Sequence, residues 1–231
     1  MSCLTAIDRA TKLHQLEQHL RLAYGEPQWQ PGVDPVDELV NTILSQATSD
    51  TNRDKGFAAL KQHFTTWHEV MDADPEQVIT VIRPAGLARQ KGPRIQAALR
   101  TILDRHGTIS LDFLADMPLA EAKAWLTSID GIGPKTAAII LLFAFNRPAF
   151  PVDTHVHRIS QRLGLIETKV TADKAHDLLE NAGDPITFYP LHLNLIRHGR
   201  EVCQARRPRC AVCVVQTICD EYQNSTDSKH G

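Results

Sequence analysis

Four cysteines near the end of the chain have a spacing that suits metal binding. They lie in the segment CQARRPRCAVCVVQTIC, at Cys203, Cys210, Cys213 and Cys219, whereas the fifth cysteine, Cys3, is isolated. In a reducing compartment, thiols grouped in this way are metal ligands more often than disulfide partners. Four thiolates can hold either zinc or an iron–sulfur cluster. The segment therefore predicts a metal centre without deciding which metal it holds.

A lysine stands at the start of an apolar run that is typical of a helix. The stretch SIDGIGPKTAAIILLFAF places Gly131, Gly133 and Pro134 directly before Lys135. Glycines permit positive φ and close approach of a neighbour, and the free N–H groups at a helix start can bind phosphate. With the preceding LAEAKAWLTSI, this makes a helix–hairpin–helix unit that would grip a DNA backbone without reading its sequence. A lysine is electrostatically unfavourable at a helix start, so Lys135 is either a solvated phosphate contact or a nucleophile.

The rest of the chain must supply the elements that position these groups. Its 231 residues, 42% of them apolar, suffice for one large domain or two smaller lobes. Apolar residues recur at helical spacing, most clearly in DPVDELVNTILSQATSD, where Asp34 can cap a helix that Pro35 opens. Comparable helices are expected at residues 4–24, 51–63, 75–82, 92–106, 111–117, 119–128, 136–145, 155–163, 172–182 and 188–203. No long stretch alternates apolar and polar residues with the period of two that is typical of a strand, so we expect an all-α fold.

Charge and hydropathy limit the possible partners. The formal net charge of −2 does not indicate a polyanion partner, so any nucleic-acid site must come from local basic residues. No signal peptide is recognisable, and the longest apolar run, at 137–145, is too short to cross a bilayer. We therefore expect no membrane association. The expected location is the cytoplasm, with the nucleoid, in a bacterium or archaeon, and otherwise the nucleus or an organelle.

Three features together resemble the endonuclease III family of helix-hairpin-helix DNA glycosylases that carry an iron–sulfur cluster. They are the hairpin SIDGIGPKTA, the segment FPVDTHVHRISQRLGL, whose Asp153 lies 18 residues after Lys135, and the Cys-x6-Cys-x2-Cys-x5-Cys pattern. The resemblance runs from about Pro35 to Cys219. It implies a two-lobed helix-hairpin-helix glycosylase fold. Residues 37–147 would form a six-helix barrel, residues 1–36 and 148–222 an iron–sulfur cluster domain, and residues 223–231 a flexible tail.

The resemblance also implies an activity, that of a bifunctional DNA glycosylase and AP lyase of base excision repair. The substrate would be double-stranded DNA containing a damaged base or an abasic site, and the expected lesions are oxidised pyrimidines. The base is extruded, and Lys135 as the free amine displaces it to give a Schiff base, after which β-elimination cuts the strand. Asp153 would stabilise charge at the sugar and assist proton transfer, although it suits the N-cap of the next helix equally well. The protein is expected to act as a monomer.

The resemblance assigns the remaining site residues. The four cysteines would hold a [4Fe–4S] cluster, and the loop QARRPR between the first two would bind phosphate through Arg206, Arg207 and Arg209; a merely solvated basic loop is the alternative. Gln46 corresponds to a glutamine that fills the gap left by the flipped base, but an ungapped alignment from Ser45 puts that role on Ala47, and Gln46 also suits a polar helix face. His155 matches a position near the family active site or is an ordinary histidine at a helix start that bonds its own backbone.

Two other functions remain open at this stage. One is a monofunctional glycosylase for adenine or mismatched thymine, a class that lacks the hairpin lysine and uses water. The adenine enzymes carry a glutamate near the position of Asn41, where this chain has none. The other is a catalytically silent DNA-binding module with a structural cluster. The presence of Lys135 argues against the first alternative, and the presence of both Lys135 and Asp153 argues against the second.

Overall fold

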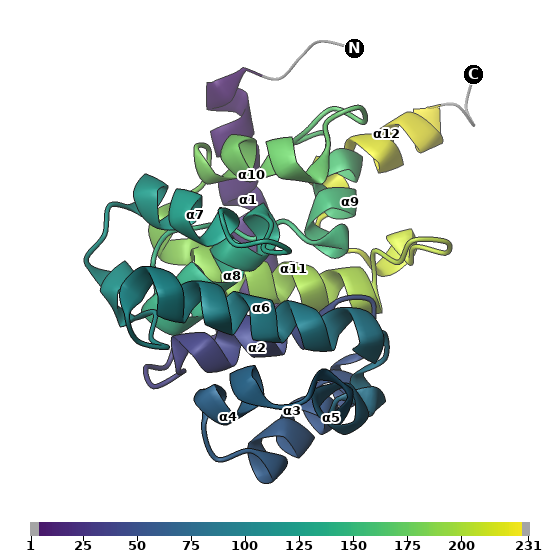
Figure 1. The fold of residues 1–231 in the computed structure, drawn as a ribbon. Helices are drawn as coiled ribbons and strands as arrows, with labels where there is room; N and C mark the ends of the chain where they lie inside the picture. Colours follow the sequence, from purple (N-terminus) through teal and green to yellow (C-terminus); the bar gives the residue numbers. More distant parts are fainter. Residues whose placement is uncertain (1–4, 228–231) are drawn as a thin grey trace. The chain divides into compact units, whose positions relative to one another are not determined.

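The computed structural model describes residues 5–227, and within that range it contains helices and loops but no strand (Figure 1). The expectation of an all-α fold is confirmed. The described chain divides into two compact units, one formed by Pro31–Arg147 and the other by the residues up to Gln30 together with those from Pro148 onward. This unit begins at residue 31 and not at the expected residue 37, and it includes Asp34 and Pro35, which open the helix Pro35–Ser45.

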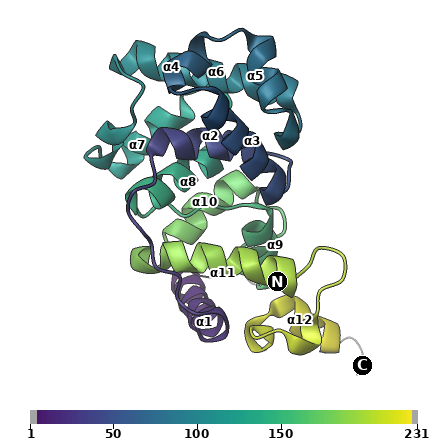
Figure 2. The same cartoon turned by 90° about the horizontal axis from the view of Figure 1, so that it is seen from below.

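The unit 31–147 is a bundle built around one apolar helix, α2. Asp34 caps it by accepting hydrogen bonds from the Val36 and Asp37 N–H groups at 2.9 and 2.8 Å. Its buried stripe packs against α3, α6 and α8 (Figure 2). The elements of this unit are α2 (Pro35–Ser45), α3 (Asp50–His63), α4 (Trp67–Asp72), α5 (Pro75–Val81), η1 (Arg83–Ala85), α6 (Ala88–His106), η2 (Asp112–Ala115), α7 (Leu119–Thr127) and α8 (Pro134–Phe145).

The second unit joins the first helix of the chain to its C-terminal half. Leu13, Leu16 and Leu20 of α1 are buried, as are Leu191 and Leu195 of α11, and these two helices pack together. The α9 helix contacts α10, α11 and α12. The elements of this unit are α1 (Ala6–Tyr24), α9 (Thr154–Arg162), α10 (Ala172–Glu180), η3 (Pro185–Thr187), α11 (Phe188–Glu201), η4 (Cys210–Val212), η5 (Gln216–Ile218) and α12 (Asp220–Asp227).

The structure differs from the expected flexible tail at 223–231. Residues 223–227 belong to α12, which begins directly after the last of the four cysteines. Gln223 ties the helix to the preceding loop, since its backbone N–H donates to the Cys219 carbonyl at 3.0 Å and its side chain donates to the Thr217 carbonyl at 2.7 Å. Residues 228–231 lie outside the described range.

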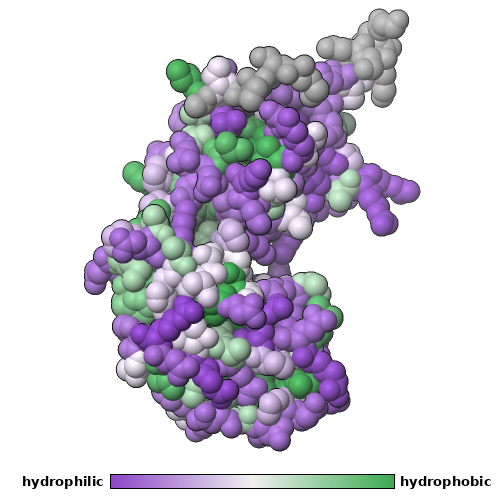
Figure 3. Space-filling model, turned by 45° about the horizontal axis from the view of Figure 1, so that its top comes forward, coloured by the Kyte–Doolittle hydropathy of each residue, from purple (hydrophilic) through white to green (hydrophobic). Residues whose placement is uncertain are grey.

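The face drawn in Figure 3 is mostly hydrophilic, with hydrophobic side chains in small separate groups. Within residues 5–227, no helix combines the length and the apolar character needed to cross a membrane.

Candidate active site and metal centre

The hairpin between α7 and α8 holds Lys135 at the start of α8. Ile129 and Ile132 are buried and anchor the turn, and Gly131 has φ +80°, a conformation that favours glycine. Gly133, by contrast, has φ −93° and needs no such freedom. Its contribution is to begin α8 without a side chain that caps the helix, so the N–H groups of the first turn face outward without an intramolecular side-chain acceptor.

Lys135 is the second residue of α8 and is exposed. Its amine makes no hydrogen bond or ion pair within the described part of the chain. The next residues, Thr136, Ala137 and Ala138, are buried, and α8 packs against α2 and α7. The helix is therefore fixed while the amine is accessible, and any loss of water around the amine must come with the substrate.

Gln46 is the C-cap of α2, and its side chain contacts another helix of the same unit. Its Oε1 accepts a hydrogen bond of 2.6 Å from Nη1 of Arg94 on α6. The next residue, Ala47, is exposed with φ +50°, and Ser49 caps α3. Of the two positions considered for the gap-filling glutamine, only Gln46 carries a side chain long enough to enter a gap.

Two residues near this loop were missed by the sequence reasoning. Lys91 is fully buried, and its Nζ donates to the carbonyls of Leu44 and Ala85 at 2.7 and 2.8 Å. Burial lowers the pKa of Lys91. Because one ammonium binds the ends of both α2 and η1, the loop that follows Leu44 and the loop that follows Ala85 are neighbours.

The second missed residue is Leu87, in the loop after η1. It is 50% exposed and has φ +50°, which is unusual for a leucine. An exposed apolar side chain at such a tip is the type of group that DNA-bending proteins insert between base steps. The signal in the sequence is RPAGLARQKGPRIQ, which places a leucine directly after a glycine turn and before a helix.

Asp153 is the N-cap of α9, and its Oδ1 accepts from the Val156 N–H at 2.8 Å. The extended segment before it is held by three side chains. Nδ1 of His176 lies 2.9 Å from the Phe150 carbonyl, Nδ1 of His192 lies 3.1 Å from the Pro151 carbonyl, and a Glu180 carboxylate oxygen accepts from the Phe150 N–H at 2.9 Å. The backbone of Asp153 is therefore fixed on both sides, by these contacts to the residues before it and by the helix α9 after it.

His155 is engaged within its own unit. Its Nδ1 lies 3.1 Å from Nη2 of Arg158, and its ring packs so closely on Gly199 that a methyl group there would fall 2.6 Å from Nδ1. The expected bond to its own backbone is not the one observed, since the partner is an arginine side chain. Arg158 also donates to the Gly199 and Cys203 carbonyls, so His155 is linked to the start of the cysteine segment.

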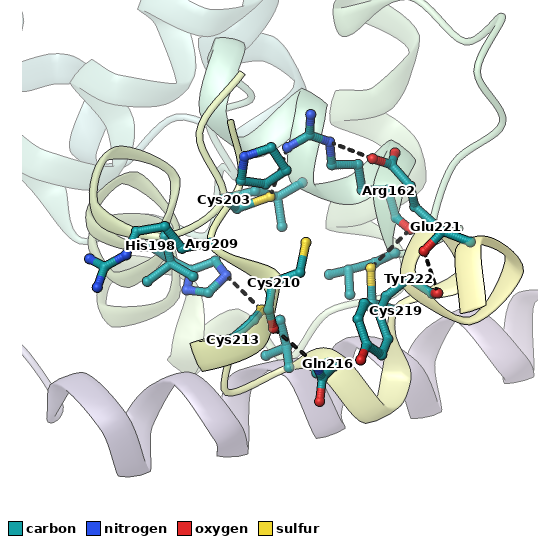
Figure 4. A pocket seen from close by; sticks show the side chains of 16 residues that line it. Arg162, His198, Cys203, Arg209, Cys210, Cys213, Gln216, Cys219, Glu221 and Tyr222 are labelled. Atoms are coloured by element: carbon teal, nitrogen blue, oxygen red, sulfur yellow. Dashed lines mark hydrogen bonds and ion pairs between the residues drawn. The ribbon is translucent and has the colours of Figure 1, made fainter. Parts of the chain in front are cut away.

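The four cysteines line one cavity of about 230 Å³ between α9, α11 and the loops before α12 (Figure 4). The thiols of Cys203, Cys210 and Cys219 point into the space that Figure 4 shows. Burial raises the pKa of the Cys213 and Cys219 thiols. The four cysteines are partly buried, and a raised pKa keeps these two thiols protonated when nothing binds them, so they are poor nucleophiles.

The chemistry of these side chains suits a thiolate-bound metal centre. All four cysteines line the same cavity, so their thiols can serve one centre together. Four thiolates are a donor set that suits either a zinc ion or an iron–sulfur cluster.

Arg162 organises the loop after Cys203. Its guanidinium donates to the Cys203 Sγ at 3.3 Å and to the carbonyls of Gln204 and Ala205 at 2.8 and 3.1 Å. The same side chain pairs with Glu221 at 3.2 Å. Beyond these anchors lie three exposed arginines, Arg206, Arg207 and Arg209. The loop is therefore held by protein contacts at its base, while its charges face solvent.

His198 lines the cavity beside Cys213. Its Nδ1 is 2.9 Å from the Tyr24 hydroxyl, and its Nε2 is 3.6 Å from the Cys213 Sγ. Burial lowers the pKa of His198 to about 4, so the ring is neutral at physiological pH. A neutral ring that accepts from Tyr24 at Nδ1 carries its proton on Nε2, where it can donate to the sulfur.

Lys135, Gln46, Gly131 and Gly133 thus lie in the unit 31–147, whereas Asp153, His155 and the cysteine segment lie in the other. Residues 40–185 match the model of the HhH-GPD superfamily of base excision DNA repair proteins. The chain belongs to this superfamily. The match covers most of the unit 31–147 and continues through α9 and α10, so it includes both Lys135 and Asp153.

Relatives narrow the assignment within the superfamily. Endonuclease III of Thermotoga maritima is 33% identical over 190 residues, which cover 82% of this chain and 84% of the relative. Endonuclease III of Escherichia coli is 31% identical over 84% of this chain and 86% of its own. The chain is therefore an endonuclease III-like DNA glycosylase of base excision repair, as the sequence resemblance indicates.

Solved structures agree on the fold. A non-covalent endonuclease III–DNA complex superimposes with a TM-score of 0.79 at 24% identity, covering 97% of this chain and 99% of the other. A trapped covalent endonuclease III–DNA intermediate gives 0.81 at 24% identity, over 96% and 99%. A thermostable thymine-DNA glycosylase gives 0.77 at 17% identity, over 94% and 97%. The fold is therefore shared by glycosylases of different specificity.

Proposed function

We propose that the protein is a bifunctional glycosylase and AP lyase that removes oxidised pyrimidines from double-stranded DNA, with Lys135 as its nucleophile. The observation that carries this proposal is the exposed amine of Lys135, held on a rigid helix directly beside the hairpin of Gly131 and Gly133. A nucleophile at this place meets the sugar of a nucleotide whose phosphate lies on the helix N-terminus. Relatives named endonuclease III support the choice of enzyme family, and the lesion class is what the resemblance to that family implies.

DNA binding would use two positive elements of the chain. The uncapped N–H groups of α8 suit one phosphate, because the helix end carries partial positive charge. The exposed arginines Arg206, Arg207 and Arg209 suit others, and Arg162 keeps the base of their loop in place. Both elements would contact the DNA backbone only, which suits an enzyme that must work in any sequence.

The reaction would begin after the damaged nucleotide leaves the base stack. The neutral Lys135 amine attacks C1′, the glycosidic bond breaks with its electrons going to the base, and the base takes up a proton. The amine loses a proton as the sugar ring opens, which leaves an iminium between Nζ and C1′. Removal of the acidified C2′ proton then breaks the C3′–O bond and cuts the strand 3′ to the lesion.

Asp153 would support this chemistry while it remains the cap of α9. Its Oδ1 is used by the Val156 N–H, so the second carboxylate oxygen is the one suited to face developing positive charge at the sugar. The backbone contacts made by His176 and His192 would keep this oxygen at a constant position. His155 would act only by positioning this region, since Arg158 and Gly199 occupy its ring.

The cysteine cavity would hold a [4Fe–4S] cluster through Cys203, Cys210, Cys213 and Cys219. Such a cluster supplies an electron-rich inorganic core whose binding free energy becomes folding free energy for the segment that ligates it. The residues of this chain then act around it: Arg162 and His198 offer N–H donors to Cys203 and Cys213, and the rigid segment presents the arginine loop.

Borohydride trapping on a duplex with one oxidised pyrimidine tests the proposal. The wild-type protein should form a covalent adduct, and Lys135→Ala should form none while its DNA affinity stays within about tenfold. Lys55→Ala, which replaces an exposed lysine on α3 of the same unit, serves as the control and should trap normally. Base release without an adduct in the wild type would establish a monofunctional glycosylase instead.

Asp153→Asn separates catalysis from helix capping. Asparagine caps helices about as well as aspartate, so the thermal stability should be unchanged while base release slows. Asp153→Ala should lose the cap as well, at a cost of about 1 kcal/mol. An Asn variant with wild-type rate would reduce the role of Asp153 to that of a cap.

A further inference from the structure

Arg94, on α6, contacts two parts of the proposed DNA-binding site that are far apart in the sequence. Its Nη1 donates to the Gln46 Oε1 at 2.6 Å. Its aliphatic part lies across the hairpin glycine, so that a methyl group on Gly131 would fall 2.5 Å from Cδ and 2.6 Å from Nε. One half-buried side chain therefore touches both the residue that ends α2 and the turn that precedes Lys135.

The same face of α6 also binds the backbone at the end of α2. Lys91 lies three residues before Arg94, so the two side chains are neighbours on the helix surface. Lys91 binds the Leu44 carbonyl, two residues before Gln46, and the Ala85 carbonyl. The α6 helix thus holds the end of α2 by its backbone through Lys91 and by its side chain through Arg94.

The chemistry of the partner orients the Gln46 amide. A guanidinium has donors and no acceptor, so the atom of Gln46 that faces it must be the oxygen. The NH₂ group of the same amide then faces away from Arg94. Because the charge-assisted bond holds the oxygen on the side of Arg94, the two N–H donors are the part of the amide that is left to face a further partner.

We propose that Arg94 is a positioning residue that presents the Gln46 amide, NH₂ group outward, for insertion into the gap left by the extruded base. The NH₂ donors would then meet acceptor atoms of the DNA. A free glutamine has three rotatable bonds to order at the moment of insertion, whereas a glutamine held by Arg94 is already ordered and binds with a smaller entropic loss. This inference rests on the proposed function, and it adds a residue and an orientation to it.

The test measures how strongly the protein prefers a duplex with a stable tetrahydrofuran abasic analogue over the same undamaged duplex. Arg94→Met and Gln46→Ala should each reduce this preference by about tenfold, the effect of losing one hydrogen bond to a charged group. The double variant should be no worse than Gln46→Ala alone. Losses that multiply in the double variant would overturn the proposal, because they would mean that Arg94 acts independently of Gln46.

Two further variants test the orientation and the contact with the hairpin. Gln46→Glu keeps an oxygen for Arg94 but removes the NH₂ donors, so it should lose the preference as fully as Gln46→Ala. Gly131→Ala displaces Arg94 sterically and should reproduce the loss seen in Arg94→Met. A Gln46→Glu variant with wild-type preference, or a Gly131→Ala variant with Gln46-dependent preference intact, contradicts the proposal.

Arg100→Met is the matched control on the same helix. Arg100 also donates one hydrogen bond to a carbonyl of its unit, that of Met71, at 3.1 Å. It should change the thermal stability about as much as Arg94→Met and leave the preference unchanged. An equal loss of preference in Arg100→Met would make the effect a general one of stability. A wild-type protein that shows neither preference nor borohydride trapping would instead refute the proposed function.

Discussion

Replacing Glu38 by glutamine should stabilise the protein at alkaline pH and leave its stability unchanged in acid. Glu38 lies on α2, where it is partly buried and accepts a hydrogen bond of 3.2 Å from the Thr42 hydroxyl. Burial raises the pKa of Glu38 from 4.5 to about 7; the bond from Thr42 and the charge of Arg53 oppose this shift, and the charge of Asp37 adds to it. The carboxylate is thus less favourable in the folded protein than in the unfolded chain.

The sign and size of the effect follow from proton linkage. Between pH 4.5 and 7 the folded state holds a proton that the unfolded state releases, so the free energy of unfolding falls as the pH rises. A difference of about 2.5 pKa units, at 1.36 kcal/mol each, amounts to about 3 kcal/mol lost above pH 7. Glutamine carries no charge at any of these pH values, so the variant escapes this loss. Its oxygen can still accept from Thr42.

Urea denaturation of the whole protein between pH 5 and 9, followed by tryptophan fluorescence, measures the difference. Trp67 and Trp125 both lie in the unit that contains Glu38. The stability of Glu38→Gln minus that of the wild type should rise from about 1 kcal/mol at pH 5 to about 3 kcal/mol at pH 9. The exposed Glu121→Gln should show no such rise. A flat difference for Glu38→Gln across this range would refute the reasoning from burial.

Two other variants test long-range contacts. Lys91→Met should destabilise the protein by about 2–5 kcal/mol in urea titrations, because the buried carbonyls of Leu44 and Ala85 lose their donor; a loss below about 1 kcal/mol would mean that water replaces the ammonium. His198→Leu removes the N–H beside Cys213 and the acceptor of Tyr24. If the proposed cluster is bound, its visible absorption should decay faster in this variant than in the wild type, and equal decay would leave His198 without a role at the cluster.

The strongest helices could be predicted because their signals are local. Asp34, Pro35 and the apolar stripe of α2 all lie within the seventeen residues 34–50. The two glycines and the lysine of the hairpin lie within residues 131–135. The spacing of the four cysteines predicts a metal centre in the same way, from a short local pattern. Helix α4 was missed because its six residues, Trp67–Asp72, are too few to show a period.

Errors arose where a local signal competed with packing. The spacing at 111–117 predicts a helix, but the chain forms only the short η2 there, since only Leu111 and Leu114 of this stretch are buried. The α6 helix begins at Ala88 and not at residue 92, because Leu87 turns the chain and Pro93 is accommodated within the second turn. Neither the short η2 nor the early start of α6 can be predicted from the helix propensities of these residues.

The contacts that build the site join residues far apart along the chain. Arg94 and Gln46 are 48 positions apart, and Lys91 and Leu44 are 47. Nothing in the sequence near Gln46 indicates that an arginine will bind its oxygen, nor does the cysteine segment indicate that Arg162 will hold its loop. Such pairings follow only from the way in which the helices pack.

The two units differ in the continuity of their chain, and this sets the order in which they can be completed during synthesis. Residues 31–147 leave the ribosome as one uninterrupted stretch, so this bundle has all of its helices before the second half of the protein exists. The α1 helix emerges earlier still, but its apolar face has to wait for α11. The nascent chain therefore exposes Leu13, Leu16 and Leu20 until α11 has been made, and the cavity of the four cysteines is the last part to assemble.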